Sequence, residues 1–418
     1  MATRVAKVKS QDLRARLANA IGKIGIYSSH EHYCPEAEYL GLHLDFVSLF
    51  GYLGYVLSAS GMPSETLTKL RNPDIDESAK WALFEPYRES VRNTEYFREI
   101  RIALRNLYDI PDLTRSTYHA VGECLRREQR PGAYRALLEK AGIEYALTDS
   151  MKDISLYPQY DPAVFGMIYR INPRRFRDDC LQQSLDSADR ALEAVDRIVA
   201  DLASRGIRGI KIAAAAGGVR LDFRRWPQAD VRSGYQAFVR NDCSSTATDV
   251  CASLPFLHAL HFRFVEQAVR RSMLIQIHTG MQSYAAGDPY FLKTLIDAFP
   301  NAVFDLFHAG YPYHGNLAVF ASWFPNVYPD MCWMASVSKV LATRILSEWL
   351  EMVPATKVLG FGSDHGFIVN TYAYQIMARE IVTDVLEERI LSGRFDEDEA
   401  MRIARLILRD NLKTILAG

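Results

Sequence analysis

Six residues whose types suit metal binding follow or lie within short apolar runs of this chain. They are His30, His32, Lys211, His278, His308 and Asp364. The runs that deliver them read KIGIYSS, GIRGI, MLIQI, VFDLF and VLGFGS. A buried strand presents its last side chains at such a position, so we expect the six to converge at one end of a barrel. Imidazoles with a carboxylate are ligands of divalent metals.

The HEH triplet places two imidazoles on one face. A strand alternates its faces with period two, so His30 and His32 point the same way and Glu31 points the opposite way. Two imidazoles in register can bind one divalent cation. The alternative is a pair of polar loop residues, which the similar residues at the other run ends disfavour.

Lys211 is predicted to lie inside the barrel, where a charged side chain needs a partner. In GIRGIKIAA, Ile210 and Ile212 face the helices, so Lys211 faces the interior. An unpaired buried ammonium is costly. Three roles stay open: a carboxylated lysine that bridges two metals, an ammonium that binds a substrate carboxylate, or a structural ion pair.

The elements that position these residues alternate along the chain. Eight apolar runs can be marked out, and most of them are closed by Gly, Pro or a polar residue, as parallel strands buried on both faces are. They span 23–30, 144–150, 164–173, 206–214, 273–280, 303–310, 326–334 and 358–364. Amphipathic helical patterns such as SADRALEAVDRIVADLASRG lie between them. This alternation predicts an α/β fold, a (β/α)8 TIM-like barrel.

Long insertions interrupt the alternation. About 110 residues separate the first two strands, and amphipathic stretches there predict a helical cap over 33–143. A second, polar insertion spans roughly 219–253. We expect one barrel domain over 1–418, with C-terminal helices over 371–418.

Composition excludes several classes of protein. The formal net charge is −1, which favours neither nucleic acid nor an anionic membrane as a partner. No apolar run approaches the roughly 20 residues of a spanning helix, and the N-terminus lacks the apolar core of a secretory signal. Six cysteines occur without a CxxC pair. We expect a cytoplasmic homo-oligomer that acts on a small molecule.

The motifs resemble a known family. HEH, Lys211, HTG, HAG and GSD, in this order, resemble the amidohydrolase superfamily of metal-dependent hydrolases and, within it, the amidohydrolase-2 group. The stretches HTGMQ, FHAGYPYHGNLAVFASWFPNVYPD and FGSDHGF resemble the amidohydrolase-like half of glutamine synthetase fusion proteins. The resemblance runs from His30 to about Arg379.

The resemblance implies roles for the six residues. His30 and His32 would bind the more buried metal beside Asp364, and Lys211 would bridge if carboxylated. His278 and His308 would bind a second metal or the substrate. The cofactor is one or two divalent ions, zinc first, with manganese or iron as alternatives. A divalent ion lowers the pKa of its water toward roughly 7. Asp364 would move the proton, and a second metal or an imidazole such as His308 would polarise the scissile carbonyl.

Substrate contacts are expected from residues beyond the strand ends. They are Arg170, Arg220, Gln282, Tyr311 and His314. An arginine fork recognises carboxylates. The resemblance implies hydrolysis of a C–N bond in a small amide or lactam, and the arginines favour a substrate that bears a carboxylate. The alternatives are a non-oxidative decarboxylase of a small acid, which Lys211 disfavours, and a non-catalytic binding or regulatory barrel.

Overall fold

The computed structural model describes residues 2–149, 154–217, 219–240 and 247–417, and it forms two compact units. Unit 1 comprises Met1–Phe165, Met331–Glu348 and Gly360–Asp410. Unit 2 comprises Gly166–Asp330, Trp349–Leu359 and Asn411–Gly418. The predicted domain boundaries, with one barrel over 1–418, a cap over 33–143 and terminal helices over 371–418, stay a prediction.

Unit 1 contains two parallel strands, β1 (Ile26–Glu31) and β2 (Ile143–Thr148). Their register pairs Ile26 with Ile143 and Ser28 with Ala146. The segment 360–364 also follows β1: Ser29 N donates to Phe361 O at 2.9 Å, and Asp364 N donates to His30 O at 3.0 Å. The carboxyl end of β1 is therefore held by hydrogen bonds to residues far along the chain.

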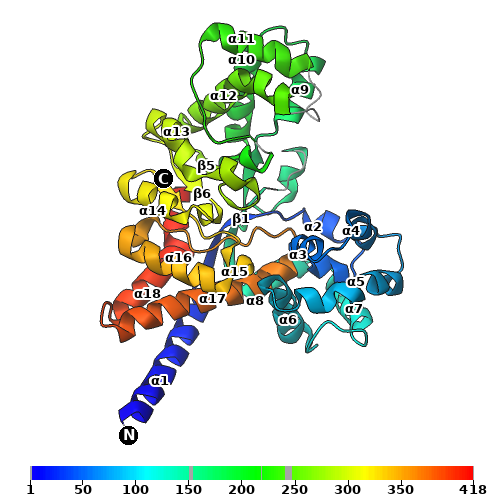
Figure 1. Ribbon diagram of the computed structural model, residues 1–418, viewed down its shortest axis with the longest axis vertical. Coiled ribbons are helices and arrows are strands. Elements are labelled where there is room, and N and C mark those ends of the chain that lie inside the picture. The colour runs from blue at the N-terminus through cyan, green and yellow to red at the C-terminus, as the bar shows by residue number, and fades with distance from the viewer. Residues whose placement is uncertain (1, 150–153, 218, 241–246, 418) are drawn as a thin grey trace. The chain divides into compact units, whose positions relative to one another are not determined.

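The stretch between β1 and β2 is helical, as predicted, and we call it the helical insertion (Figure 1). Its helices are α2 (Glu36–Tyr39), η1 (Phe46–Leu49), α3 (Leu53–Ala59), α4 (Ser64–Arg71), α5 (Glu77–Val91), α6 (Glu95–Tyr108), α7 (Tyr118–Glu128) and α8 (Ala133–Ala141). Side chains cap several of them: Asp76 accepts from Ser78 N, and Thr94 accepts from Phe97 N.

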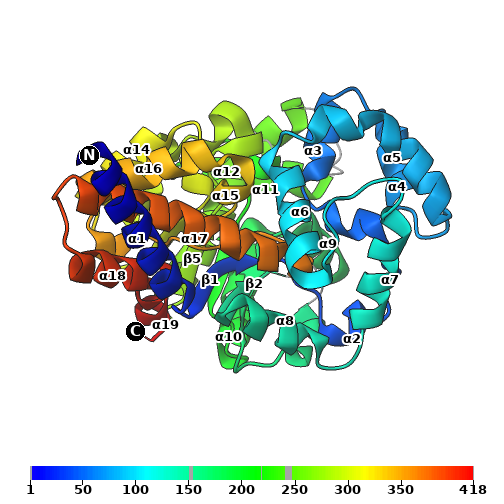
Figure 2. The same cartoon turned by 90° about the horizontal axis from the view of Figure 1, so that it is seen from below.

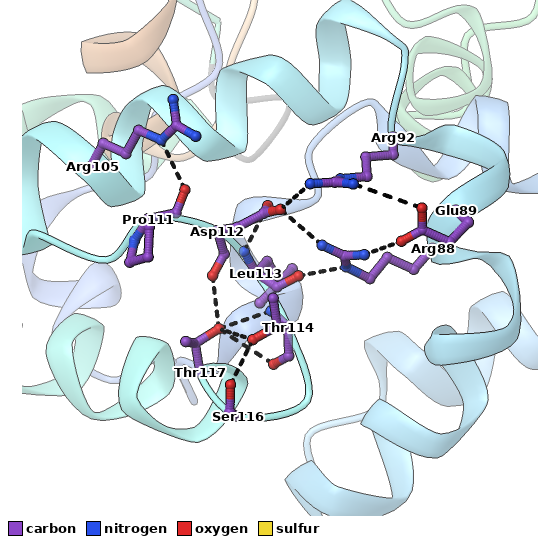
Figure 3. A network of polar contacts seen from close by, with 10 residues as sticks. All are labelled: Arg88, Glu89, Arg92, Arg105, Pro111, Asp112, Leu113, Thr114, Ser116 and Thr117. Atoms are coloured by element: carbon purple, nitrogen blue, oxygen red, sulfur yellow. Dashed lines mark hydrogen bonds and ion pairs between the residues drawn. The ribbon is translucent and has the colours of Figure 1, made fainter.

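A polar network holds the loop that joins α6 to α7 (Figure 3). The Asp112 carboxylate accepts from Arg88 and Arg92, each at 2.9 Å. Thr117 Oγ1 donates to Asp112 O at 2.7 Å, and Arg105 Nε donates to Pro111 O at 2.8 Å. The loop is thus attached to α5 and α6 by charged hydrogen bonds, which are stronger than neutral ones.

Helix α17 (Ile368–Leu391) is the centre of unit 1. It packs against α1 (Ala2–Gly22), which lies beside it in both views (Figures 1 and 2), and against α6, α8 and α18 (Glu397–Arg405). Buried residues occur all around this helix, because neighbours cover it on several sides. Helices α15 (Met334–Val337) and α16 (Lys339–Met352) precede it.

Unit 2 is built on a parallel sheet. Its strands are β3 (Phe165–Arg170), β4 (Gly209–Ile212), β5 (Leu274–Ile277), β6 (Phe304–Leu306) and β7 (Val327–Pro329), which pair in chain order. Each lies within its predicted run. Strand β7 ends at Pro329, whose carbonyl oxygen accepts from Leu359 N at 3.0 Å, and Asp330 N donates to Leu306 O of β6 at 3.1 Å.

Helices separate the strands of unit 2. They are α9 (Pro173–Gln182), α10 (Ala188–Ser204), α11 (Gln228–Arg240), α12 (Ala247–Val269), α13 (Lys293–Ala298), α14 (His314–Trp323) and the C-terminal α19 (Asn411–Ala417). Helix α10 is capped by Ser187, whose side chain accepts from Arg190 N, and Gly206 follows the helix with φ of 74°. Helix α12 packs on α10 and α11.

The predicted eighth strand differs from the structure. In the described part of the chain, 358–364 forms only an isolated bridge between Asp330 and Leu359. Its backbone changes partner within three residues, because Leu359 N bonds to Pro329 and Phe361 O bonds to Ser29. Between them, Gly360 N donates to Ile407 O of the C-terminal segment at 2.7 Å, and this bond outside the sheet interrupts the ladder.

Among the described helices, none combines the length and the apolar character that crossing a membrane requires.

Candidate functional site

A cluster of metal-binding side chains lies at the carboxyl ends of β1 and β2 in unit 1. His30, His32 and Asp149 each offer one ligand atom, and these atoms all lie within 4.8 Å of one another. His30 is fully buried and Asp149 is buried at the end of β2. His32 Nδ1 lies 2.6 Å from Asp149 O, which leaves Nε2 of His32 for a ligand.

Asp364 lies against both histidines. Its Oδ1 is 3.1 Å from His32 Nε2 and 3.6 Å from His30 Nε2. Asp364 has φ of 62°, in the left-handed region that aspartate tolerates better than most residues. The structure therefore brings together three of the six predicted residues in unit 1.

Glu31 lies on the opposite face of β1 from the two histidines, and its carboxylate fixes the residues next to Asp364 by hydrogen bonds. Its carboxylate accepts from Ser28 Oγ at 2.6 Å, from Ser363 Oγ and N, and from His365 N at 3.2 Å. The residues on both sides of Asp364 are thus tied to the residue between the two histidines. Burial raises the pKa of Glu31, while the hydrogen bonds from Ser28 and Ser363 lower it.

The helical insertion contributes two groups to the same place, the partly buried Tyr52 and the buried Glu99. The Tyr52 hydroxyl donates a hydrogen bond to Asp364 Oδ2 at 2.6 Å, and Glu99 Oε1 lies 2.9 Å from His365 Nε2. Burial lowers the pKa of His365, but the charge and hydrogen bond of Glu99 outweigh it, so the pKa lies above its ordinary value. Burial, and then the charge of Asp364, raise the pKa of Tyr52 well above 10. Tyr52 is therefore a hydrogen-bond donor.

The other three predicted ligands lie in unit 2. His308 Nε2 and His278 Nδ1 are 3.0 Å apart, which is close enough for both to bind one ion. Lys211 is 2% exposed, and its ammonium lies 4.9 Å from the centre of the Phe307 ring. His308 has φ of 60°, a conformation that is uncommon outside glycine and concentrates at functional sites.

Lys211 belongs to a row of polar side chains across the sheet of unit 2. The register places Arg170, Lys211, Gln276 and Asp305 side by side on β3 to β6. Gln276 Nε2 donates to Asp305 Oδ2 at 2.9 Å. Burial, and then the neighbouring Asp330 carboxyl, raise the pKa of Asp305 well above its usual range, and the Lys211 charge opposes this.

The predicted substrate residues also belong to unit 2. Arg170 ends β3 beside Lys211, and the Arg220 guanidinium lies 3.9 Å from the centre of the Phe291 ring. The Tyr311 and His314 rings stack with centroids 6.4 Å apart. The side chain of Gln282 lies outside the described residues. None of these five contacts is tested by the structure, so their roles stay predictions.

A glycine permits the close packing of the loops after β5 and β6. Gly280 has φ of 59°, and a Cβ there would lie 2.2 Å from Tyr311 O. The HTG motif therefore needs its glycine for backbone reasons.

Both groups of candidate ligands have donor atoms that suit a divalent metal. In unit 1 the donors are two imidazoles and two carboxylates, all buried or nearly so, and their ligand atoms converge. This donor set fits zinc, manganese or iron. In unit 2 the pair His278 and His308 fits an ion as well, and Lys211 would join it only as an anion. That both groups serve one active site stays a prediction.

Sequence reasoning missed three residues of the unit 1 cluster. Asp149 follows the apolar run EYALT, so its position after β2 is the same signal that identified Asp364. Tyr52 and Glu99 lie inside helical patterns of the insertion. Their partners Asp364 and His365 are more than 260 residues away, and no local pattern indicates such pairs.

Comparisons with known proteins identify the family of this chain. A family model described as amidohydrolase matches residues 177–393, more than half of the 418 residues. The chain therefore belongs to the amidohydrolase family, a family of metal-dependent enzymes, and the predicted resemblance is confirmed. The curated protein fluG of Emericella nidulans is 30% identical over 142 residues, which are 33% of this chain and 16% of that protein. The match thus covers about one sixth of fluG.

Solved structures show the fold. A uronate isomerase of Thermotoga maritima has a TM-score of 0.77 at 14% identity, covering 97% of each chain. A glucuronate isomerase of Caulobacter crescentus has a TM-score of 0.72 at 14% identity, covering 98% of this chain and 94% of that one. A Lactobacillus casei protein described as a metal-dependent hydrolase has a TM-score of 0.68 at 16% identity, covering 96% and 97%. The predicted α/β barrel class with its helical insertion is confirmed.

Proposed function

We propose that the protein is a metal-dependent hydrolase that cleaves the C–N bond of an amide or lactam in a small, carboxylate-bearing substrate. The observation that carries the proposal is the cluster of His30, His32 and Asp149 with Asp364 Oδ1 against both histidines. Membership of the amidohydrolase family supports it. The Lactobacillus casei protein described as a hydrolase supports it as well.

Four residues would hold the ion in unit 1: His30, His32, Asp149 and Asp364. A divalent ion bound there supplies Lewis acidity and lowers the pKa of water to near neutrality. Asp364 accepts the proton of the attacking water and returns it to the leaving nitrogen, so that nitrogen departs as an amine. Its place beside the histidines, with Oδ2 held by Tyr52, aligns the carboxylate for both transfers.

The residues of unit 2 bind and polarise the substrate in this proposal. His308 donates a hydrogen bond to the scissile carbonyl oxygen, where negative charge develops. Arg170, which pairs in register with Lys211, binds the substrate carboxylate. Tyr311 and His314 contribute a stacked aromatic wall.

Isomerisation of a uronate is the second candidate function. Two structural neighbours described as isomerases of uronates match nearly the whole chain, including the helical insertion. A uronate also bears a carboxylate, which Arg170 suits equally well. In that reaction Asp364 would move a proton between adjacent carbons rather than from water to nitrogen.

One experiment separates these reactions. Protein loaded with zinc, manganese or iron is incubated with N-acyl amino acids, lactams, uronates and small aromatic acids in 18O-labelled water and in D2O. Hydrolysis yields a carboxylate that carries one 18O, whereas isomerisation conserves mass apart from one deuterium, and decarboxylation releases CO2. We expect label in the carboxylate, and Asp364→Asn should lower kcat at least 100-fold. Turnover of uronates alone would overturn the hydrolase proposal, and no turnover by any loaded form would favour a non-catalytic barrel.

A further inference from the structure

The phenol of Tyr52 makes two contacts with one residue of the metal cluster. Its hydroxyl lies 2.6 Å from Asp364 Oδ2 and 2.5 Å from Asp364 O. The other carboxylate oxygen, Oδ1, faces His32 Nε2 and His30 Nε2. The two oxygens of Asp364 therefore have different partners, one from the helical insertion and one from β1.

The ring of Tyr52 is held in place by other aromatic rings. It packs on Trp333 with centroids 4.3 Å apart, on His365 at 5.4 Å and on Tyr55 at 5.8 Å in a nearly parallel stack. Trp333 is buried, and His365 is in turn paired with Glu99. A ring enclosed in this way points its hydroxyl in one direction without further loss of side-chain entropy on binding.

We propose that Tyr52 is a positioning residue of the ion site: its phenol determines which oxygen of Asp364 faces the histidines. This inference rests on the proposed function, because it concerns the ion that His30, His32 and Asp149 hold.

The physical reason lies in the carboxylate itself. The side-chain torsion of an aspartate that ends in its carboxylate is broad and roughly two-fold, so either oxygen can turn toward a partner. A donor on Oδ2 and on the backbone carbonyl removes this freedom and leaves the Oδ1 lone pairs directed at the histidines. Groups that orient metal ligands in this way typically account for about 10- to 100-fold in metal affinity.

Tyr55 offers a matched control. It lies one helical turn from Tyr52, and its ring stacks on that of Tyr52. It is half exposed, and its hydroxyl makes no hydrogen bond to Asp364 among the described residues. Removing the Tyr55 hydroxyl therefore changes the same aromatic stack without touching the contact in question.

The test compares the wild-type protein, Tyr52→Phe and Tyr55→Phe in their binding of Co²⁺. Affinity is measured by competition with a chromophoric chelator, and the visible absorption of bound Co²⁺ reports the ligand geometry. We expect Tyr52→Phe to bind Co²⁺ about 10-fold or more weakly with an altered spectrum, and Tyr55→Phe to match the wild type. Equal affinity and spectrum in all three proteins would overturn the proposal.

A double-mutant cycle distinguishes positioning from a general loss of structure. If Tyr52 acts through Asp364, then Tyr52→Phe has no further effect on Co²⁺ affinity in an Asp364→Asn background. An equal loss in both backgrounds would overturn the positioning role. Circular dichroism of the metal-free proteins checks that each variant folds. Failure of the wild type to bind Co²⁺ would instead contradict the metal site of the proposed function.

Discussion

At the scale of single residues, Glu31 has a part that the HEH pattern did not indicate. It points away from the histidines, as the alternation of a strand requires, yet it determines where the residues around Asp364 lie. Its carboxylate is completely buried and accepts from hydroxyl and backbone donors on three sides. A group in this position needs acceptor atoms only.

Replacement of Glu31 by Gln should therefore be damaging although the two side chains have the same shape. The amide would turn a nitrogen toward Ser363 or His365, which offer only donors there, and a buried donor without an acceptor costs about 1–3 kcal/mol. We expect the free energy of unfolding in urea to fall by about 2 kcal/mol or more, with weaker binding of Co²⁺.

The exposed Glu65 is the control, because its partner Lys69 lies on the same helix surface. Glu65→Gln should leave the urea transition unchanged. A Glu31→Gln protein as stable as the wild type would mean that the hydroxyls around Glu31 rearrange to accept from the amide.

At the scale of elements, the insertion is held together by charged contacts that can be removed one at a time. Asp112→Ala removes the acceptor of both Arg88 and Arg92 (Figure 3). We expect the loop 109–117 to open more readily, by about 1–3 kcal/mol in the opening free energy. Amide hydrogen exchange across this loop is the measurement. Glu89→Ala removes a partner of Arg88 that is 70% exposed, and should change exchange little.

A second prediction at this scale concerns two histidines of α12 and the stability of the fold at low pH. Burial lowers the pKa of both His258 and His261 to about 4. His258 Nδ1 also accepts from Arg224 N at 3.0 Å and from Trp226 Nε1 at 3.1 Å, and protonation of Nδ1 would break both bonds. Since the unfolded chain binds these protons near pH 6.5, the folded state binds fewer protons between pH 4 and 6.5. Stability should therefore fall as the pH falls through that window, by up to about 1 kcal/mol per pH unit for each histidine.

His258→Gln tests this assignment, because the amide oxygen can still accept from Arg224 and Trp226. We expect a shallower loss of thermal stability from pH 7 to pH 4.5 than in the wild type. His119→Gln, at an exposed histidine of the insertion, controls for the loss of an imidazole elsewhere in the chain. An unchanged slope in His258→Gln would assign the acid sensitivity to other groups.

These elements also show what local pattern can and cannot predict. Seven apolar runs became strands, because burial on both faces leaves a strong mark on composition. The run 358–364 did not, since Gly360 N bonds to Ile407 O of the C-terminal segment instead of to a neighbouring strand, and no pattern of apolar residues indicates such a bond. Among the candidate site residues, His30, His32 and Asp364 were predicted from the apolar runs that precede them, whereas Asp149 was missed although it follows such a run as well. Tyr52 and Glu99 act over distances in sequence that periodicity does not reach.

At the scale of the whole molecule, ion binding by the ligands of unit 1 and by those of unit 2 can be tested separately. We expect about two divalent ions per chain by plasma mass spectrometry in protein grown with added zinc and bicarbonate. Lys211→Ala or His308→Ala should reduce this to about one, because the unit 1 cluster contains its own four ligands. His30→Ala should remove the other ion. One ion per chain that is insensitive to Lys211 would contradict a carboxylated bridge and favour the isomerase or decarboxylase chemistry.

The separation in sequence between Glu31 and its partners has a consequence for biosynthesis. Glu31 leaves the ribosome 332 residues before Ser363, and His32 leaves it well before Asp364. A nascent chain can bring His30, His32 and Asp149 together early, but it cannot orient them until the residues beyond 363 have been made. An ion captured during translation would thus meet an open, exchangeable site. Selection of the correct metal would be completed only when the last part of the chain closes over β1.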